Sequence, residues 1–174
     1  ARRNWKQWVL EHGEVPPPGI KPILALDVGE YDSDDNVLAA RYGLWTAPFL
    51  AWKGLDLESS GDRVKRYLPE YEGYQHIAVD SIGVGAGMPH QLRRKGVRNV
   101  TSVKVVEKPT TTPKDDSGIP IGHFVALRDQ LWWMAREYLR LNPDAMLPDD
   151  IELEADLTTP TYIHKRGRIK VMDK

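Results

Sequence analysis

The chain has 174 residues, of which 41% are apolar and 28% charged, the composition of a folded globular protein rather than of a disordered or fibrous one. The absence of cysteine excludes disulfide scaffolds, zinc–cysteine sites and thiol nucleophiles, and no apolar run reaches the roughly 18 residues of a membrane span, so no membrane partner is expected. A formal net charge of −1 argues against a wholly basic nucleic-acid binder but permits a local basic face.

The N-terminal twenty residues are predicted to form a helix and a linker. Trp5, Trp8 and Val9 have helical spacing within residues 4–12, and the prolines at 16–18 cannot continue a helix. We therefore interpret residues 1–20 as a linker helix with a proline-rich linker, and residues 21–174 as one domain. The chain begins with neither Met nor an apolar leader, so we expect it to be part of something longer.

Strands dominate the next part of the chain. The short apolar run 23–26 predicts a buried strand that ends in Asp27, and residues 37–42 and 45–52 predict two more strands. Short connections between them predict an antiparallel meander. A helix is expected to start at residues 59–62.

A second buried strand, residues 76–80, follows that helix and also ends in an aspartate, Asp80. Because the helix allows a crossover, the end of this strand is expected near the end of the first one. The glycine-rich residues 83–87 then open a short helix that runs through Arg94, residues 100–106 predict a strand, and residues 108–121 predict a loop.

The C-terminal part is predicted to contain a long helix over residues 123–141, a short helix over 151–157 and a hairpin around Arg166-Gly167. The apolar stripe of the long helix consists of Leu127, Leu131, Met134, Ala135, Tyr138 and Leu139. These elements together predict an α/β fold with a mixed central sheet, helices on both of its faces and a C-terminal basic hairpin.

The two aspartates that end apolar strands are candidate metal ligands. Clefts form beyond strand ends in such sheets, and two carboxylates placed there repel each other unless a proton or a cation lies between them. Without nearby Cys or His, an oxygen-only ligand set favours Mg²⁺ or Mn²⁺, and two such ions can act together in phosphodiester hydrolysis. The alternative is that Asp27 and Asp80 only start turns or cap helices.

Two further segments could belong to such a site. In the acidic loop after the first strand, Asp32 and Asp34 are interpreted as part of a solvated turn, and Asp35 as the better additional metal ligand. The loop lacks the glycine and glutamate of a calcium loop. Residues 83–87 could cradle a phosphate with backbone N–H groups or simply form a tight turn beside the acidic residues, and the sequence does not separate these alternatives.

Basic residues cluster in two places. Lys165, Arg166, Arg168 and Lys170 form a compact positive hairpin tip that suits a DNA backbone, although a solvated turn or a protein contact is the alternative. The second cluster, residues 93–95 with Arg98, is interpreted as a solvated helix face.

From about Ile23 to its C-terminus the chain resembles the nuclease domain of the large terminase subunit of tailed bacteriophages. Four stretches in order carry the resemblance: Leu26-Asp27-Val28-Gly29 followed by Asp35-Asn36-Val37; Ile77-Ala78-Val79-Asp80 with its glycines; Phe124 through Arg128 to Trp132-Trp133; and Glu152 to Leu157 followed by Thr159-Pro160-Thr161-Tyr162 and Gly167-Arg168-Ile169-Lys170.

The resemblance implies a ribonuclease H-like fold and a divalent-metal endonuclease that cuts concatemeric viral DNA during genome packaging. It implies that Asp27 and Asp80 are catalytic metal ligands of a two-metal site. Its implied partners are double-stranded DNA, an ATPase domain of the same polypeptide, the small terminase subunit and the portal, in the cytoplasm of an infected bacterium.

The chain departs from the family pattern in its metal ligands. The family's third aspartate follows the Gly-Arg-Ile-Lys hairpin in a helix, and we expect that residue beyond Lys174, because neither Asp156 nor Asp173 replaces it. No Walker A motif occurs in the chain. Two alternative functions stay open, a non-enzymatic module that docks DNA or partner subunits and a resolvase of branched DNA with the same fold.

Overall fold

The computed structural model describes residues 1–30, 33–115 and 117–172, and the chain divides into two compact units. Unit 1 comprises Ala1–Lys104 and Asp144–Pro148, and unit 2 comprises Val105–Pro143 and Asp149–Lys174. Within the described ranges, no helix combines the length and apolar character that crossing a membrane requires.

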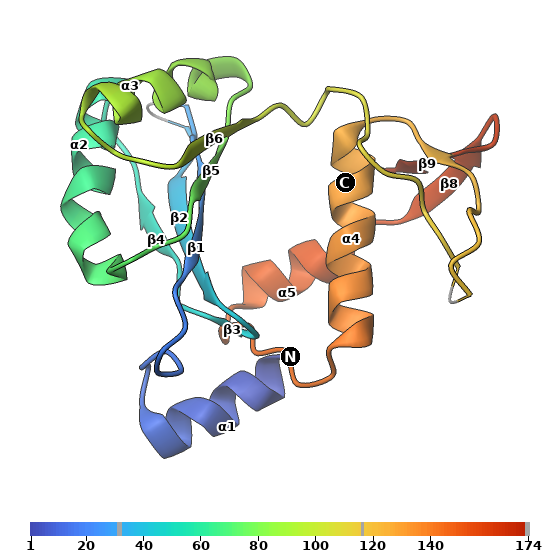
Figure 1. The fold of residues 1–174 in the computed structure, drawn as a ribbon, viewed down its shortest axis with the longest axis horizontal. Coiled ribbons are helices and arrows are strands. Elements are labelled where there is room, and N and C mark those ends of the chain that lie inside the picture. The colour runs from blue at the N-terminus through green and yellow to red at the C-terminus, as the bar shows by residue number, and fades with distance from the viewer. Residues whose placement is uncertain (31–32, 116, 173–174) are drawn as a thin grey trace. The chain divides into compact units, whose positions relative to one another are not determined.

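Unit 1 is built on a six-stranded mixed sheet (Figure 1). Its strands are β1 (Ile23–Asp27), β2 (Asn36–Tyr42), β3 (Trp45–Thr46), β4 (Leu50–Trp52), β5 (Ile77–Asp80) and β6 (Val100–Val103). The order is β3-β2-β1-β5-β6, with β4 also paired to β2. β1 is antiparallel to β2 and parallel to β5, so the predicted meander and the crossover that returns to the first strand are both confirmed.

The third predicted strand, residues 45–52, is interrupted. β3 and β4 both pair with β2, through Arg41↔Thr46 and Leu38↔Leu50, so three residues of the broken strand face two residues of β2. Pro48 lies in the interruption, where its missing N–H removes a donor that a continuous ladder requires.

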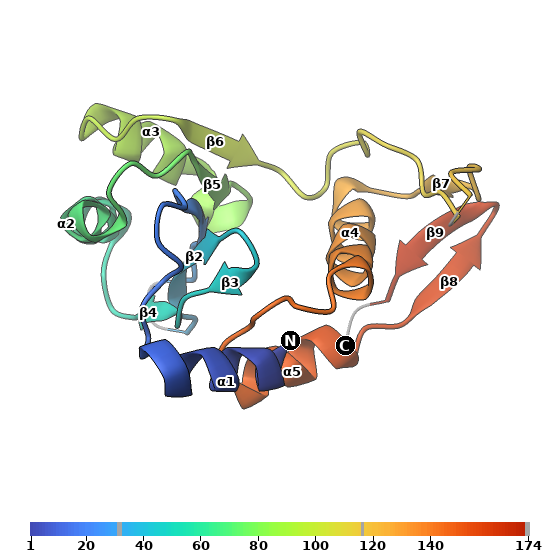
Figure 2. The ribbon, with the colours of Figure 1, turned by 60° about the horizontal axis from the view of Figure 1, so that its bottom comes forward.

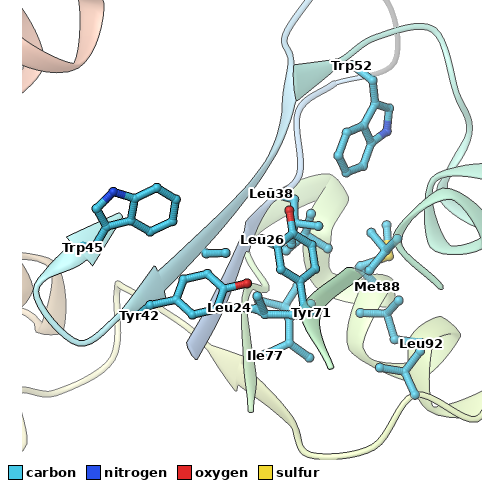
Figure 3. Packing of buried hydrophobic residues seen from close by; sticks show 14 of the residues in the cluster. Leu24, Leu26, Leu38, Tyr42, Trp45, Trp52, Tyr71, Ile77, Met88 and Leu92 are labelled. Atoms are coloured by element: carbon cyan, nitrogen blue, oxygen red, sulfur yellow. The ribbon is translucent and has the colours of Figure 1, made fainter. Parts of the chain in front are cut away.

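One face of this sheet carries the core of unit 1. In the register of the strands, Leu24 lies beside Ile77 and Leu26 beside Val79, and all four are buried. The helices α2 (Leu57–Tyr67) and α3 (Met88–Arg94) cover this face, as Figures 1 and 3 show, with Val64, Met88 and Leu92 among the buried side chains. Burial of one such side chain stabilises the fold by about 1.5–3 kcal/mol.

The opposite face of the sheet is lined by small side chains and is not fully covered. Ala25 is exposed, and Ala39 and Ala78 are half-buried. Asp27 and Asp80 follow the same alternation and lie on this alanine face. The expectation that β1 and β5 are buried strands is therefore wrong for one of their faces. Buried and more exposed residues alternate along both strands, but the more exposed positions hold alanine, which is apolar, so the sequence reads as a continuous apolar run.

The start of α2 differs from the prediction at residues 59–62. Asp56 is the N-cap residue, and its side chain accepts a hydrogen bond of 2.7 Å from the Ser59 N–H. Further along, Lys95 joins α3 to α2, because its Nζ lies 2.6 Å from Asp62 Oδ1 while its side chain is only 14% exposed. The lysine stem passes close to Gly61, where a Cβ would lie 3.1 Å from Lys95 Cε.

The predicted N-terminal helix is α1 (Arg2–His12), and it contributes to the core of unit 1. Trp5 is 6% exposed, and its indole N–H donates a 2.9 Å hydrogen bond to the Thr46 carbonyl. The segment Asp144–Pro148 also joins this unit, since Met146 N–H donates to the Leu44 carbonyl and Thr46 N–H donates to the Met146 carbonyl.

Unit 2 contains α4 (Leu127–Leu141), α5 (Ile151–Thr158) and a separate three-stranded sheet (Figure 2). The strands β7 (His123–Phe124), β8 (Tyr162–Lys165) and β9 (Arg168–Val171) have the order β7-β9-β8. The long helix starts at Leu127 rather than at the predicted residue 123, because His123 and Phe124 pair in parallel with β9.

Two polar side chains of α4 are buried. Asp129 accepts hydrogen bonds from the Ala126 N–H at the start of the helix, at 2.9 Å, and from the Val171 N–H of β9, at 2.7 Å. Gln130 accepts a 2.6 Å hydrogen bond from the Thr110 N–H and so fixes the loop that precedes β7. These contacts tie α4 to its neighbours, whereas Leu131 and Met134 of the predicted apolar stripe are exposed.

The β8–β9 hairpin forms as predicted. Lys165 pairs with Arg168, and the two turn residues, Arg166 and Gly167, have φ angles of 51° and 73°. Positive φ at both central residues is the mark of the two-residue hairpin turn whose twist matches the flanking strands.

Candidate metal centre and nucleic-acid interface

The structure places Asp27 and Asp80 next to each other. β1 and β5 are parallel, and their register pairs Leu26 with Val79, so the next residue of each strand is an aspartate at the same edge of the sheet. We call this edge, where β1 and β5 end, the carboxyl edge. Neighbouring strands are about 4.8 Å apart, so the two aspartates lie side by side at this edge.

The surroundings of Asp27 raise its pKa. Partial burial raises the pKa of Asp27, and the negative charge of Asp80 raises this pKa further. A hydrogen bond from the Val28 N–H opposes the shift, and the charge of Asp34 adds to it. Ionised Asp27 is therefore destabilised here, and a bound cation would relieve that destabilisation.

The turn after β5 holds the Asp80 carboxylate in place. Asp80 Oδ1 accepts a 3.2 Å hydrogen bond from the Ile82 N–H, just before the 3₁₀ turn of Gly83–Gly87. Within this turn the backbone at Gly85 passes so close to β5 that a Cβ there would lie 2.3 Å from the Asp80 carbonyl oxygen. Of the two interpretations of the glycine-rich residues, this geometry favours the tight turn beside the acidic site.

The acidic loop returns to the carboxyl edge because of Gly29. A Cβ at this position would lie 2.6 Å from the carbonyl oxygens of both Asp34 and Asp35, so the loop can pack against β1 only over a glycine. The loop places the charge of Asp34 close enough to raise the pKa of Asp27. Asp34 is exposed in a bend, as expected of a solvated turn residue, and its charge still acts on Asp27 because the loop packs over Gly29.

Asp35, the expected additional ligand, has a different neighbour. Its Oδ1 lies 3.9 Å from Lys53 Nζ, with both side chains about half exposed, and Lys53 also donates a hydrogen bond to the Ser33 carbonyl. The charge of Asp34 acts on the pKa of Asp27, whereas Asp35 is not among the charges that do, and the role of Asp35 as an additional ligand stays a prediction. Asp32 of the same loop and Asp173 lie outside the described residues.

The donor set fits a hydrated cation with few protein ligands. Across residues 1–30, 33–115 and 117–172, no three or more His, Asp or Glu side chains form a group that could hold a metal ion. Zinc takes four ligands, usually three or four of them from the protein, whereas Mg²⁺ keeps several waters and often takes one or two carboxylates together with substrate phosphates. The oxygen donors of Asp27 and Asp80 therefore fit a divalent cation that keeps several of its waters.

In unit 2 the hairpin presents a basic face. Because side chains alternate along a strand, the buried Ile169 and Val171 point to one side of β9 while Arg168 and Lys170 point to the other. Lys165 lies directly opposite Arg168 and shares its face. Three of the four predicted DNA contacts are thus brought together, and the fourth, Arg166, lies exposed at the turn.

An aromatic cluster supports the other side of this hairpin. The Trp133 ring of α4 meets Tyr162 of β8 edge-on at 5.4 Å and lies 6.3 Å from Phe124 of β7. The Arg136 guanidinium lies 5.0 Å from the Trp133 ring centre. Aromatic pairs of this kind add about 0.5–1.5 kcal/mol each beyond their buried area, so the hairpin is fixed against α4.

Comparison with known proteins identifies the fold. No protein-family model and no curated protein sequence matches the chain. Among solved structures, the nuclease domain of the large terminase subunit gp2 of bacterial virus Sf6 matches 99% of this chain and 87% of its own, with a TM-score of 0.70 at 23% identity. The large terminase nuclease from thermophilic phage G20c with bound magnesium matches 91% of this chain and 75% of its own, with a TM-score of 0.60 at 18% identity.

A mutant of the Sf6 domain, solved with manganese and beta-thujaplicinol, matches 98% of this chain and 86% of its own with a TM-score of 0.68 at 22% identity. The chain therefore has the mixed α/β, ribonuclease H-like fold of the large terminase nuclease domains. The resemblance that the sequence predicted is confirmed at the level of the fold.

Proposed function

We propose that this chain is a divalent-metal-dependent DNA endonuclease domain that cuts concatemeric viral DNA during genome packaging. The observation that carries the proposal is the pair of Asp27 and Asp80, in register at the carboxyl edge of two parallel strands, with the pKa of Asp27 raised. The likeness to nuclease domains solved with magnesium and manganese supports it.

Asp27 and Asp80 would hold the metal, and Asp35 stays the candidate for an additional ligand from the loop that packs over Gly29. A bound divalent ion would supply an activated water and charge stabilisation on the scissile phosphate. The protein contributes the orientation of the carboxylates. The Ile82 N–H occupies one oxygen of Asp80, and this contact leaves the other oxygen available to a ligand.

The basic face of the hairpin would bind DNA through its phosphates. Lys165, Arg168 and Lys170 share one face and Arg166 extends the turn, an arrangement that reaches a phosphate backbone without reading bases. Replacing Arg166 and Arg168 with alanine is expected to reduce the slope of log affinity against log salt by about one unit per lost contact. An unchanged slope would favour a protein contact for the hairpin instead.

The partners proposed with this function are double-stranded DNA, an ATPase domain of the same polypeptide, the small terminase subunit and the portal. The place of action would be the cytoplasm of an infected bacterium. These proposals rest on the likeness to terminase nuclease domains.

A plasmid-nicking assay with Mn²⁺ tests the activity. Wild type is expected to nick and linearise the plasmid, and Asp27→Asn and Asp80→Asn to lose the activity. Asp56→Asn is a matched control, because it makes the same chemical change at the exposed cap of α2. Equal cleavage by wild type and Asp27→Asn would refute the metal assignment, and DNA binding without any cleavage would indicate a docking module. Four-way junctions beside linear duplexes would reveal a preference for branched DNA.

A further inference from the structure

Unit 1 contains an open pocket of about 420 Å³ that the proposed mechanism does not use. Its lining includes Lys65, Leu68, Pro69, Tyr74, Val97 and Arg98. Tyr74 precedes β5 and Asn99, also in the lining, precedes β6, so the pocket lies where these parallel strands begin. We call it the amino-edge pocket, since it is at the opposite edge of the sheet from Asp27 and Asp80.

Three cations from separate parts of the chain converge on this pocket. Lys65 comes from α2 and Arg98 from the loop before β6, and both line the pocket. Lys21 comes from the segment before β1, and its Cε would lie 3.4 Å from a Cβ placed at Gly73, another lining residue. All three side chains are exposed.

No carboxylate lines the pocket, and the glutamates next to it in sequence, Glu70 and Glu72, form no ion pair with its cations among the described residues. Lys21, Lys65 and Arg98 form no ion pair with a described residue, in contrast to Lys95 nearby, which pairs with Asp62. The pocket therefore carries three positive charges that the fold itself does not neutralise.

Stabilisation of helix ends explains only part of this arrangement. Lys65 lies in the last turn of α2, where a cation interacts favourably with the helix dipole. Lys21 and Arg98 lie outside any helix, so the dipole gives no reason for their position. Their mutual repulsion is unfavourable in the free protein and would be relieved by an anionic ligand.

We propose that the amino-edge pocket binds a phosphate group of the DNA backbone and so anchors the duplex at a distance from the cleavage site. The proposal rests on the proposed nuclease function. Arg98 supplies a guanidinium fork that matches phosphate oxygens, and the two lysines supply point charges. Arg94, exposed and without a described partner, adds positive charge two residues before the lining residue Gly96, which suits a chain of repeated phosphates better than one carboxylate.

The geometry sets where along the duplex this contact falls. Ile77 and Asp80 mark the two ends of β5, and three residue steps in a strand span about 10 Å. The pocket lies beyond Ile77, so it is more than about 10 Å from the carboxylates. At about 3.4 Å per base pair, the anchored phosphate would be at least about three base pairs from the bond that is cut.

A salt titration of DNA binding tests the proposal. Fluorescence anisotropy with a labelled duplex in Ca²⁺ would compare wild type with Lys65→Ala/Arg98→Ala, after thermal unfolding has shown that both fold. The double variant is expected to bind more weakly and to reduce the slope of log affinity against log salt by about two units. Arg3→Ala removes an exposed cation of α1 outside the pocket and is expected to keep a slope closer to that of wild type.

A wild-type slope in the double variant would overturn the proposal and leave the nuclease function untouched. Wild type that binds DNA through the pocket but never cleaves would support the pocket and refute the nuclease. Wild type with no DNA binding would overturn the pocket proposal. Binding of a poly-glutamate peptide, measured for wild type and for the double variant, tests whether the pocket prefers carboxylates. Loss of peptide binding with unchanged DNA binding in the double variant would assign the pocket to an acidic protein segment instead.

Discussion

Replacing Asp27 with asparagine is expected to stabilise the metal-free protein. Two unit charges about 5 Å apart repel each other by about 3 kcal/mol at an effective dielectric constant of 20 and by about 1 kcal/mol in water. The Asp27 side chain is exposed to solvent, which screens the interaction and places the expected gain near about 1 kcal/mol. For a chain of this size that gain corresponds to roughly 3 °C in the melting temperature.

The raised pKa of Asp27 determines how its contribution to stability changes with pH. Burial and the charge of Asp80 raise the pKa of Asp27 in the folded protein above its ordinary value of 3.8, so the folded chain holds this proton more tightly than the unfolded chain does. The contribution of Asp27 to stability is therefore most favourable below about pH 3.8 and decreases as the pH rises through the raised native pKa. Asp27→Asn is expected to remove that decrease.

Thermal unfolding measured from pH 3 to 8, with EDTA and then with Mn²⁺, provides the assay. Wild type is expected to gain stability on adding Mn²⁺, and Asp27→Asn to start higher at neutral pH and gain little. Asp56→Asn is expected to melt below wild type at neutral pH, because the Ser59 N–H stabilises the ionised Asp56 and holds its pKa below the ordinary value. The reasoning fails if Asp27→Asn melts below wild type in EDTA, or if Mn²⁺ stabilises both proteins equally.

Three further substitutions, one of them a control, test the backbone contacts that support the two candidate sites. Gly85→Ala would force the backbone away from the Asp80 carbonyl oxygen, so it should abolish stabilisation by Mn²⁺. Gly61→Ala is the control, because a Cβ there would meet Lys95 and Met88 and leave the turn beside Asp80 in place, so it should keep that stabilisation. Equal Mn²⁺ responses in the two variants would contradict this. Asp129→Ala removes the acceptor of two backbone N–H groups and is expected to destabilise unit 2 by about 2–4 kcal/mol in urea unfolding, with faster amide exchange at Val171. Unchanged exchange at Val171 would show that Asp129 does not hold the hairpin.

The parts of the fold that depend on local chemistry could be predicted from the sequence. Residues close together in sequence determine the hairpin turn at Arg166-Gly167 and the strand ends at Asp27 and Asp80. The structure has all three at the predicted positions. The crossover that makes β5 the neighbour of β1 followed from general rules of connection.

Errors arose where a contact distant in sequence decides the outcome. His123 and Phe124 continue the helical pattern of α4, yet they form a strand because β9, more than forty residues later, offers a free edge. The burial of Asp129 likewise depends on the distant Val171, whose N–H donates a hydrogen bond to it. The effect of the Asp34 charge on Asp27 is equally invisible in the sequence, because it depends on how the loop packs over Gly29.

Unit 1 separates charge along its strands, and this separation links the two proposed sites. Asp27, Asp80 and Asp34 make the carboxyl edge negative, while Lys21, Lys65 and Arg98 make the amino edge positive. A phosphate backbone is therefore attracted to one edge and repelled from the other until a cation neutralises the aspartates. DNA would accordingly be held first at the amino edge and would approach the carboxylates only when the metal is bound, so the order of events would follow from the direction of the strands.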